Sequence, residues 1–115
     1  MKDRRADNQD RLLQIRNAIK EIESFVSEVS ADEFNKDSLI SSAVLFQFSV
    51  IGEAVSHLDK DLLNKYEYPW YKVRAFRNLI SHEYFQIELR VVWEVIVRDL
   101  PGLGELTEMI LDEAF

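Results

Sequence analysis

Apolar residues recur at spacings of three and four positions along most of this chain, which predicts a succession of α-helices. The first expected helix covers residues 7–29, and its apolar positions are Leu12, Ile15, Ile19, Ile22, Val26 and Val29. These residues form one narrow seam, which suits a long antiparallel helix pair. Residues 30–37 are polar and break the pattern, so we expect a loop there with at most a short turn at 32–35.

The second expected helix, residues 38–58, is apolar on more than one face. Asp37 or Ser38 can cap its first turn. A helix of this kind either lies at the centre of a bundle or buries a second face against another subunit. Residues 59–68 then form a polar connection with room for one short helix.

A third helix is expected over residues 69–81, because Pro69 fits a first helical turn, where no backbone donor is needed. Residues 88–100 are rich in β-branched side chains, which raises a strand as the alternative. Arg90, Glu94 and Arg98 nevertheless follow the helical period, and this spacing favours a fourth helix.

Pro101 is expected to kink or end that fourth helix, and residues 104–115 form a last amphipathic helix. The 115 residues suffice for one core only, so we predict a single domain, 1–115. Its fold class is all-α, an up-and-down bundle of four to five helices.

The amino-acid composition limits the kinds of functional site that the chain can form. The chain has no cysteine, which excludes disulfides, thiolate zinc sites and a cysteine nucleophile. Two histidines cannot build a three-histidine metal site in one protomer, and three glycines do not form a phosphate-binding glycine loop. We therefore expect neither a metal nor a cofactor. The first ten residues lack an apolar signal segment and the longest apolar run is 43–46, so a cytoplasmic location without membrane contact is expected.

The net charge is −7, with 21 acidic against 14 basic residues, which argues against non-specific nucleic-acid binding. The third helix departs from this balance, because residues 68–82 contain no acid and include Lys72, Arg74 and Arg77. Its polar arc consists of Tyr71, Arg74, Arg77, Asn78, Ser81 and His82. An acidic chain thus carries one local basic stripe with a histidine, which can face a polyanion.

Such a stripe has the groups for RNA cleavage by the neighbouring 2′-hydroxyl. Histidine is the side chain whose ordinary pKa suits proton transfer near neutral pH. Arginine matches phosphate oxygens and can hold the charge that grows in the transition state, and an amide such as Asn78 can orient either group.

Helical geometry sets a condition on this chemistry. Asn78 and His82 share a face, whereas Arg77 and His82 diverge by about 140°. For both to reach one phosphate, the helix must end or bend near Ser81, or the site must combine two subunits. The bare spacing of Arg and His is common by chance, and a polar helix face is more often simply solvated. We interpret His57, near a helix C-terminus, as a surface residue or a partner of the helix dipole.

The segment RNLISHEYF, residues 77–85, resembles the RNxxxHxYF signature of the HEPN superfamily, specifically the HepT-like (DUF86) toxin family. Further stretches resemble the family in the same order: residues 10–13 with 15 and 18–19, 51–54 (IGEA), 69–70 (PW), 92–93 (VW) and 99–101 (DLP). The resemblance implies a HEPN-like homodimer whose two Rx4H motifs meet in a cleft and cleave RNA without a metal. It also implies a toxin whose antitoxin, an MNT-type nucleotidyltransferase, transfers AMP from ATP onto the tyrosine of the HxY motif.

Each residue role follows from the resemblance. Arg77 is implied as the phosphate ligand, His82 as the general base or acid and Asn78 as an orienting group. Tyr84 is implied as the modification site, its alternative being an aromatic packed on Phe85. Four more residues are candidates for supporting the site or the phosphate track: Glu53, Lys72, Arg74 and Ser81.

Several alternatives stay open. Glu53 either bonds to the polar groups of the site or is a structural partner of a neighbouring basic residue. Trp70 and Trp93 are interpreted as core or interface anchors. The leading hypothesis is an endoribonuclease toxin that acts on RNA. The alternatives are a non-catalytic helical module that docks a nucleotidyltransferase or binds nucleotide phosphates, and a structural bundle whose polar face meets only water.

Overall fold

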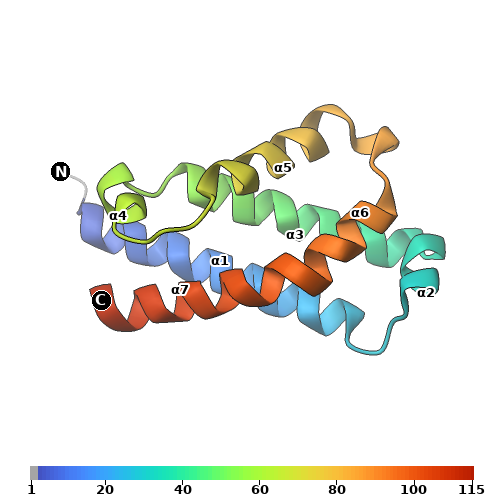
Figure 1. The fold of residues 1–115 in the computed structure, drawn as a ribbon, viewed down its shortest axis with the longest axis horizontal. Coiled ribbons are helices and arrows are strands. Elements are labelled where there is room, and N and C mark those ends of the chain that lie inside the picture. Colours follow the sequence, from blue (N-terminus) through green and yellow to red (C-terminus); the bar gives the residue numbers. More distant parts are fainter. Residues whose placement is uncertain (1–2) are drawn as a thin grey trace.

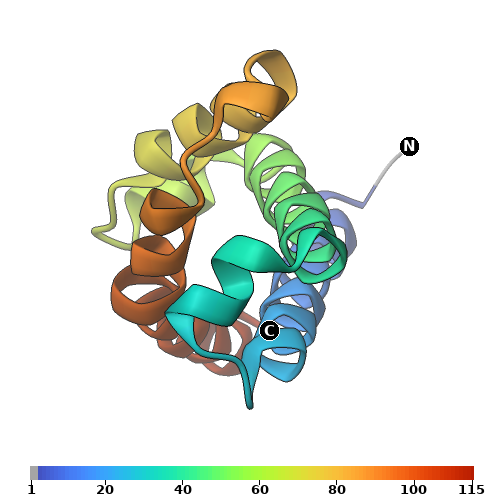
Figure 2. The ribbon, with the colours of Figure 1, turned by 90° about the vertical axis from the view of Figure 1, so that its right-hand side faces the viewer.

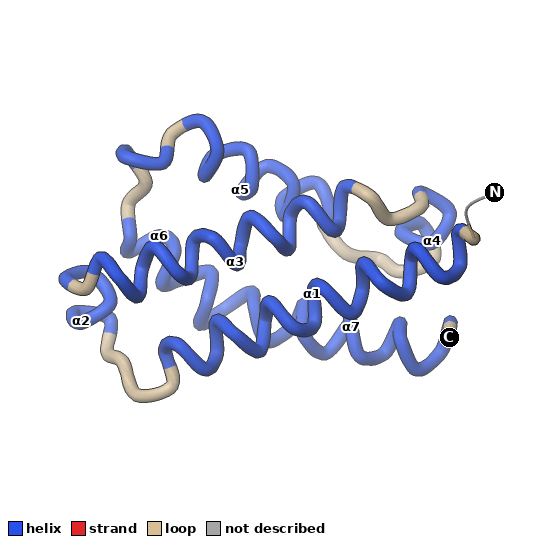
Figure 3. Tube along the Cα trace, turned by 180° about the vertical axis from the view of Figure 1, so that it is seen from behind, coloured by secondary structure: helices blue, strands red, loops and turns tan. Residues whose placement is uncertain are grey.

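The computed structural model describes residues 3–115 as helices joined by short connections, with no strand in that range (Figure 3). The elements in chain order are α1 (Arg4–Val26), α2 (Ala31–Lys36), α3 (Ser38–Ser56), α4 (Lys60–Asn64), α5 (Trp70–His82), a 3₁₀ turn (Tyr84–Gln86), α6 (Leu89–Glu94), a π-helical segment (Val95–Asp99) and α7 (Leu100–Ala114). The long elements alternate in direction (Figure 1). The prediction of an all-α, up-and-down bundle is therefore confirmed.

The predicted seam of α1 forms one side of the core. Leu12, Ile15, Ile19 and Ile22 are all buried, and α1 packs along α3 and α7. At the open end of the bundle, the Arg5 guanidinium donates to the carbonyl oxygen of Ala114 at 3.5 Å. The first and last helices are thereby joined where the described chain begins and ends.

Helix α3 lies between α1 and α5, which explains why it is apolar on more than one face. Asp37 caps it, because its carboxylate accepts from the backbone N–H groups of Leu39 and Ile40 at 3.0 and 3.2 Å. By length and hydropathy alone α3 could cross a membrane, but 44% of its apolar window is buried inside the bundle. Its hydropathy is thus that of a central packing helix.

Residues 30–37 correct the sequence prediction, since they form α2 instead of a loop. Ser30 and Glu33 make a reciprocal capping box, which supplies the missing partners of the first turn. Phe34 is fully buried and its ring lies 5.4 Å from that of Trp93. Helix α2 therefore closes one end of the bundle, where Figure 2 shows it crossing between the longer helices.

Pro101 does not end a helix, so that alternative is wrong, and the last helix begins before residue 104. The helix from Leu89 continues through Pro101 to Ala114, with a π-helical segment in between. Pro101 has no backbone N–H to donate. In the wider π-helical turn before it, backbone hydrogen bonds run to the residue five positions back, as from the Leu100 N–H to the Val95 oxygen.

Helix α5 matches its predicted range to within a residue. Pro69 is the residue immediately before the helix, and Trp70 is the first helical residue. Trp70 is buried and donates its indole N–H to the Tyr66 carbonyl at 3.2 Å, and Phe76 packs edge-on against Phe48 of α3. Helix α5 therefore rests on α3 through its apolar side and turns its basic side outward.

Candidate functional site

Helices α3 and α5 lie in close contact where Gly52 faces Arg77. A Cβ added to Gly52 would overlap the Cβ of Arg77 and crowd its Cγ. Glycine therefore lets the stem of Arg77 lie directly on the α3 backbone. The guanidinium consequently leaves the helix pair beside Glu53, the next residue of α3.

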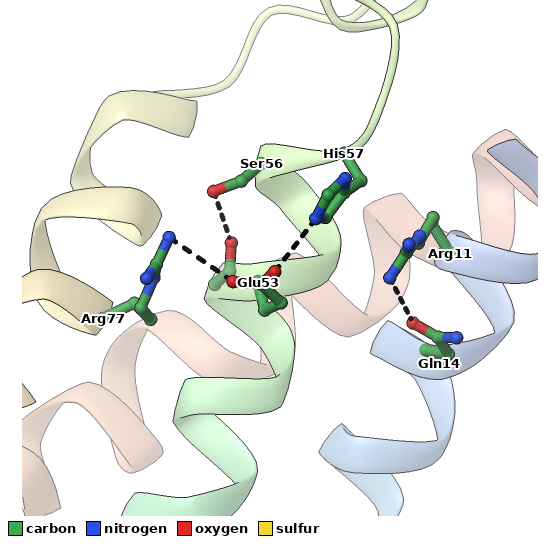
Figure 4. Close-up of polar contacts among 7 residues, drawn as sticks. Arg11, Gln14, Glu53, Ser56, His57 and Arg77 are labelled. Atoms are coloured by element: carbon green, nitrogen blue, oxygen red, sulfur yellow. Dashed lines mark hydrogen bonds and ion pairs between the residues drawn. The ribbon is translucent and has the colours of Figure 1, made fainter. Parts of the chain in front are cut away.

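A chain of three polar side chains runs from α5 to the end of α3 (Figure 4). The Nη2 of Arg77 lies 3.5 Å from Oε2 of Glu53, and Nε2 of His57 lies 2.9 Å from Oε1 of the same carboxylate. The structure thus brings Glu53 and Arg77 together. Glu53 pairs with a neighbouring basic residue, as one of the two alternatives expected, and this residue is Arg77 of the predicted site.

Charge and hydrogen bonding lower the pKa of Glu53. The largest cause is the hydrogen bond to His57, followed among the favourable ones by the charges of Arg77, His57 and Arg11, while partial burial acts in the opposite direction. Glu53 is therefore held as a carboxylate beside Arg77.

Within residues 3–115, the ion pair with Glu53 is the polar contact of the Arg77 side chain. Its side chain is 29% exposed, and its Nε is buried without a hydrogen-bond partner among the described residues. A guanidinium has five donors, and here a single ion pair of 3.5 Å uses one nitrogen. The group is partly desolvated, and most of its donors have no partner among residues 3–115.

Arg77 and Glu53 line an open hollow of about 320 Å³ together with Gln14, Ser49, Val50 and Ser81. A second hollow of about 480 Å³ shares Ser49 and Ser81 with it and reaches Tyr84. The hydroxyl of Tyr84 donates to the Ser42 oxygen at 3.0 Å. Arg77 and Tyr84 therefore line two adjacent hollows, which share Ser49 and Ser81 and which together are called the groove below.

The other residues of the predicted stripe point to solvent. Lys72, Asn78 and His82 are exposed and Arg74 is half-exposed. Across residues 3–115, the side chains of these four residues make no hydrogen bond or ion pair. They are a solvated basic surface next to the groove, and the structure does not bring them into contact with Glu53.

His82 lies apart from Arg77 within one protomer. Helix α5 stays regular through His82 and ends at Glu83, whose N–H bonds to the Leu79 oxygen. Five helical residues separate the two side chains by about 140° around the axis. The structure thus contains no bend between Arg77 and His82 that would aim both at one phosphate.

His57 is exposed and lies at the C-terminal cap of α3, as the sequence indicated. Its hydrogen bond to Glu53 is an additional contact that the sequence analysis did not predict. The available signal was its spacing, because Glu53 and His57 are four residues apart on one helix face.

The fold and this groove define a small helical-bundle protein with a basic, histidine-bearing helix whose Arg77 pairs with Glu53 of the neighbouring helix. Comparison with known proteins makes the class specific: the chain belongs to the ribonuclease HepT-like family, whose family model matches residues 15–110.

Named relatives agree with this assignment. The chain is 35% identical over 96 residues to "Putative RNase MJ0127" of Methanocaldococcus jannaschii, and the aligned region covers 82% of this chain and 79% of the relative. It is 32% identical over 97 residues to "Probable ribonuclease HepT" of Thermococcus cleftensis, which covers 84% and 88% of the two chains. A third relative, "Putative RNase TTE0752" of Caldanaerobacter subterraneus, is 33% identical over 76% of this chain and 80% of its own. No solved structure matches the chain.

Proposed function

We propose that this protein is a metal-independent endoribonuclease that acts as the toxin of a prokaryotic toxin–antitoxin pair in the cytoplasm. The observation that carries the proposal is Arg77, a partly desolvated guanidinium with a buried, unpartnered Nε, set in a surface groove. It begins the RNLISHEYF segment, and relatives of the chain carry the names "Putative RNase" and "Probable ribonuclease HepT".

The chemistry assigns one task to each group. Arg77 binds the scissile phosphate and stabilises the charge that develops on its oxygens. His82 takes the proton from the 2′-hydroxyl or returns one to the leaving oxygen, since imidazole transfers protons near neutral pH. Asn78 lies on the same helix face as His82 and orients it or the substrate. Lys72 and Arg74 extend the positive surface along the RNA backbone.

The active form is a homodimer, in which Arg77 of one protomer works with His82 of the other. The angular separation of these residues on a straight α5 supports a composite site. Exposed apolar side chains on α3 and just after α5 support such an interface: Leu39 is 80% exposed, Phe46 64% and Phe85 97%. Such residues are suited to burial against a second copy of the chain.

Tyr84 is the site of neutralisation by an MNT-type nucleotidyltransferase. Tyr84 is 40% exposed and lines the groove that also holds Arg77. AMP on the Tyr84 hydroxyl would place a phosphate and a nucleoside in the groove. The modification would then compete with RNA for Arg77.

The deciding experiment is cleavage of mixed RNA by the pure protein in EDTA, compared with Arg77→Ala and His82→Ala. Cleavage by the wild type and loss of at least a hundredfold in both variants are expected. Cleavage that persists in both variants removes the catalytic assignment. Cleavage that stops only on adding EDTA shows a metal mechanism, and RNA binding without any cleavage favours the non-catalytic module.

A further inference from the structure

We propose that His57 is a positioning residue of the Arg77 site, because it holds the Glu53 carboxylate away from full pairing with the guanidinium. This inference rests on the proposed function of Arg77 as the phosphate ligand. It concerns a residue outside the RNLISHEYF segment, on a different helix, and it predicts a direction for the effect.

The two contacts of Glu53 are unequal. Its Oε1 is held by His57 at 2.9 Å, whereas its Oε2 reaches Arg77 only at 3.5 Å (Figure 4). A carboxylate free of other partners would close on the guanidinium through two parallel hydrogen bonds. With one oxygen held by the imidazole, Glu53 steadies Arg77 without saturating it, and phosphate can bind.

The imidazole is attached to a fixed part of the backbone. The N–H of His57 bonds back to α3, and the following joint is clamped to α1 by Asn8. Asn8 is buried, its amide donates to the Asp59 carboxylate, and it accepts from the Asp59 N–H, each at 3.2 Å. His57 can therefore act as an anchor for Glu53.

Three elements contribute charge around this carboxylate. Glu53 and His57 belong to the α3 end, Arg77 to α5, and Arg11 of α1 adds a more distant positive charge. Arg11 itself donates to Gln14 at 3.4 Å, so its nearest polar partner is on its own helix. His57 and Arg77 are therefore the near partners of Glu53, and Arg11 is a more distant one.

The test measures RNA binding in a His82→Ala background, which leaves the RNA uncut and removes the other histidine. In this background His57→Ala is expected to weaken binding about fivefold, because Glu53 then neutralises Arg77. His57→Gln keeps a neutral donor of similar reach. It should therefore restore most of the affinity.

The double variant separates positioning from a structural role. In a Glu53→Gln background, His57→Ala is expected to have no effect on binding, since the competing carboxylate is gone. The proposal is overturned if His57→Ala weakens RNA binding equally in the Glu53 and Glu53→Gln backgrounds, or does not weaken it at all. Urea denaturation confirms that each variant is folded. If the variants show these binding differences but the wild type does not cleave RNA, the proposed catalysis fails and the role of His57 stands. If it cleaves RNA and His57→Ala binds normally, only this inference fails.

Discussion

The α3 backbone at Gly52 lies directly against the side-chain stem of Arg77, with no space between them for a methyl group. This contact sets the distance between α3 and α5 at the level of the groove. It also places the guanidinium beside Glu53, so one glycine fixes both the packing of α5 and the position of its arginine.

Replacing Gly52 by alanine should therefore damage both stability and activity. We expect Gly52→Ala to lower the free energy of unfolding by about 1–3 kcal/mol, because the helices must separate or Arg77 must shift. RNA cleavage should fall with it. Urea denaturation and the cleavage assay measure the two effects.

Gly102→Ala is the matched control. Gly102 lies in α7, and an added Cβ there would meet nothing within 4 Å. Alanine is the better helix former, so this variant should gain about 0.5–1 kcal/mol and cleave normally. A Gly52→Ala protein with wild-type stability and activity would contradict the packing argument.

Mixing two inactive variants tests whether the site is composite. If Arg77 of one protomer serves His82 of its partner, a dimer of one Arg77→Ala chain and one His82→Ala chain has one intact site. Random exchange should then restore about a quarter of wild-type cleavage, since half of the dimers are mixed and each has one working site. Mixtures as inactive as either parent would show that each site belongs to a single protomer.

A charge placed among the exposed apolar side chains should dissociate the proposed dimer. Phe46→Glu introduces a carboxylate on the outer face of α3, and burying it without a partner is costly. Sedimentation velocity should show a monomer for this variant and a dimer for the wild type. Val97→Glu, at a residue 55% exposed on the π-helical segment, should remain dimeric. A dimeric Phe46→Glu protein would place the interface elsewhere.

Periodicity predicted the long helices because each buries a regular stripe, as the α1 residues from Leu12 to Ile22 do. It did not predict α2, whose six residues are too few for a periodic signal and depend on a cap and on Phe34. Pro101 was expected to interrupt a helix, but a π-helical segment absorbs its missing donor. Local compensation of this kind has no signature in the hydrophobic pattern.

The site was predictable in part. The acid-free arc of α5 follows from the period of the helix, and Arg77 and His82 stand out within it. The contacts of Glu53 depend on how α3 and α5 pack, which spacing within one helix does not give. The role of Gly52 is likewise a property of the packed pair, since its neighbour is 25 residues further along the chain.

The lowered pKa of Glu53 makes its stabilising contribution depend on pH. Its partners favour the charged form in the folded state, so the contribution is present above the pKa of the unfolded chain. It is lost as the pH falls through the lower pKa of the folded state. Glu53→Gln should therefore be less stable than the wild type at pH 7 and equally stable in strong acid.

Urea denaturation at several pH values measures this difference. Glu21→Gln serves as the control, because Glu21 is exposed on α1 and makes no ion pair within residues 3–115. It should match the wild type throughout. A Glu53→Gln deficit that stays constant into acid would show that the carboxylate charge is not its cause.

Tyr84→Phe should separate modification from catalysis. The variant keeps the ring that packs edge-on against Phe85 and loses only the hydroxyl, which is the proposed acceptor of AMP and takes no part in cleavage. We expect it to cleave RNA like the wild type and to gain no AMP when coexpressed with an MNT-type nucleotidyltransferase. It should consequently remain toxic in the presence of that enzyme.

Two variants make this result specific. Ser42→Ala removes the hydrogen bond of 3.0 Å that the Tyr84 hydroxyl makes but leaves the hydroxyl itself, so it should still be modified. Tyr71→Phe removes another exposed tyrosine of the basic helix and should also be modified normally. Mass spectrometry of the intact chain and of its peptides reads out all three. AMP on Tyr71, or AMP retained by Tyr84→Phe, would move the modification site away from the groove and leave the inhibition without its proposed physical basis, because the nucleotide would then no longer lie in the groove that holds Arg77.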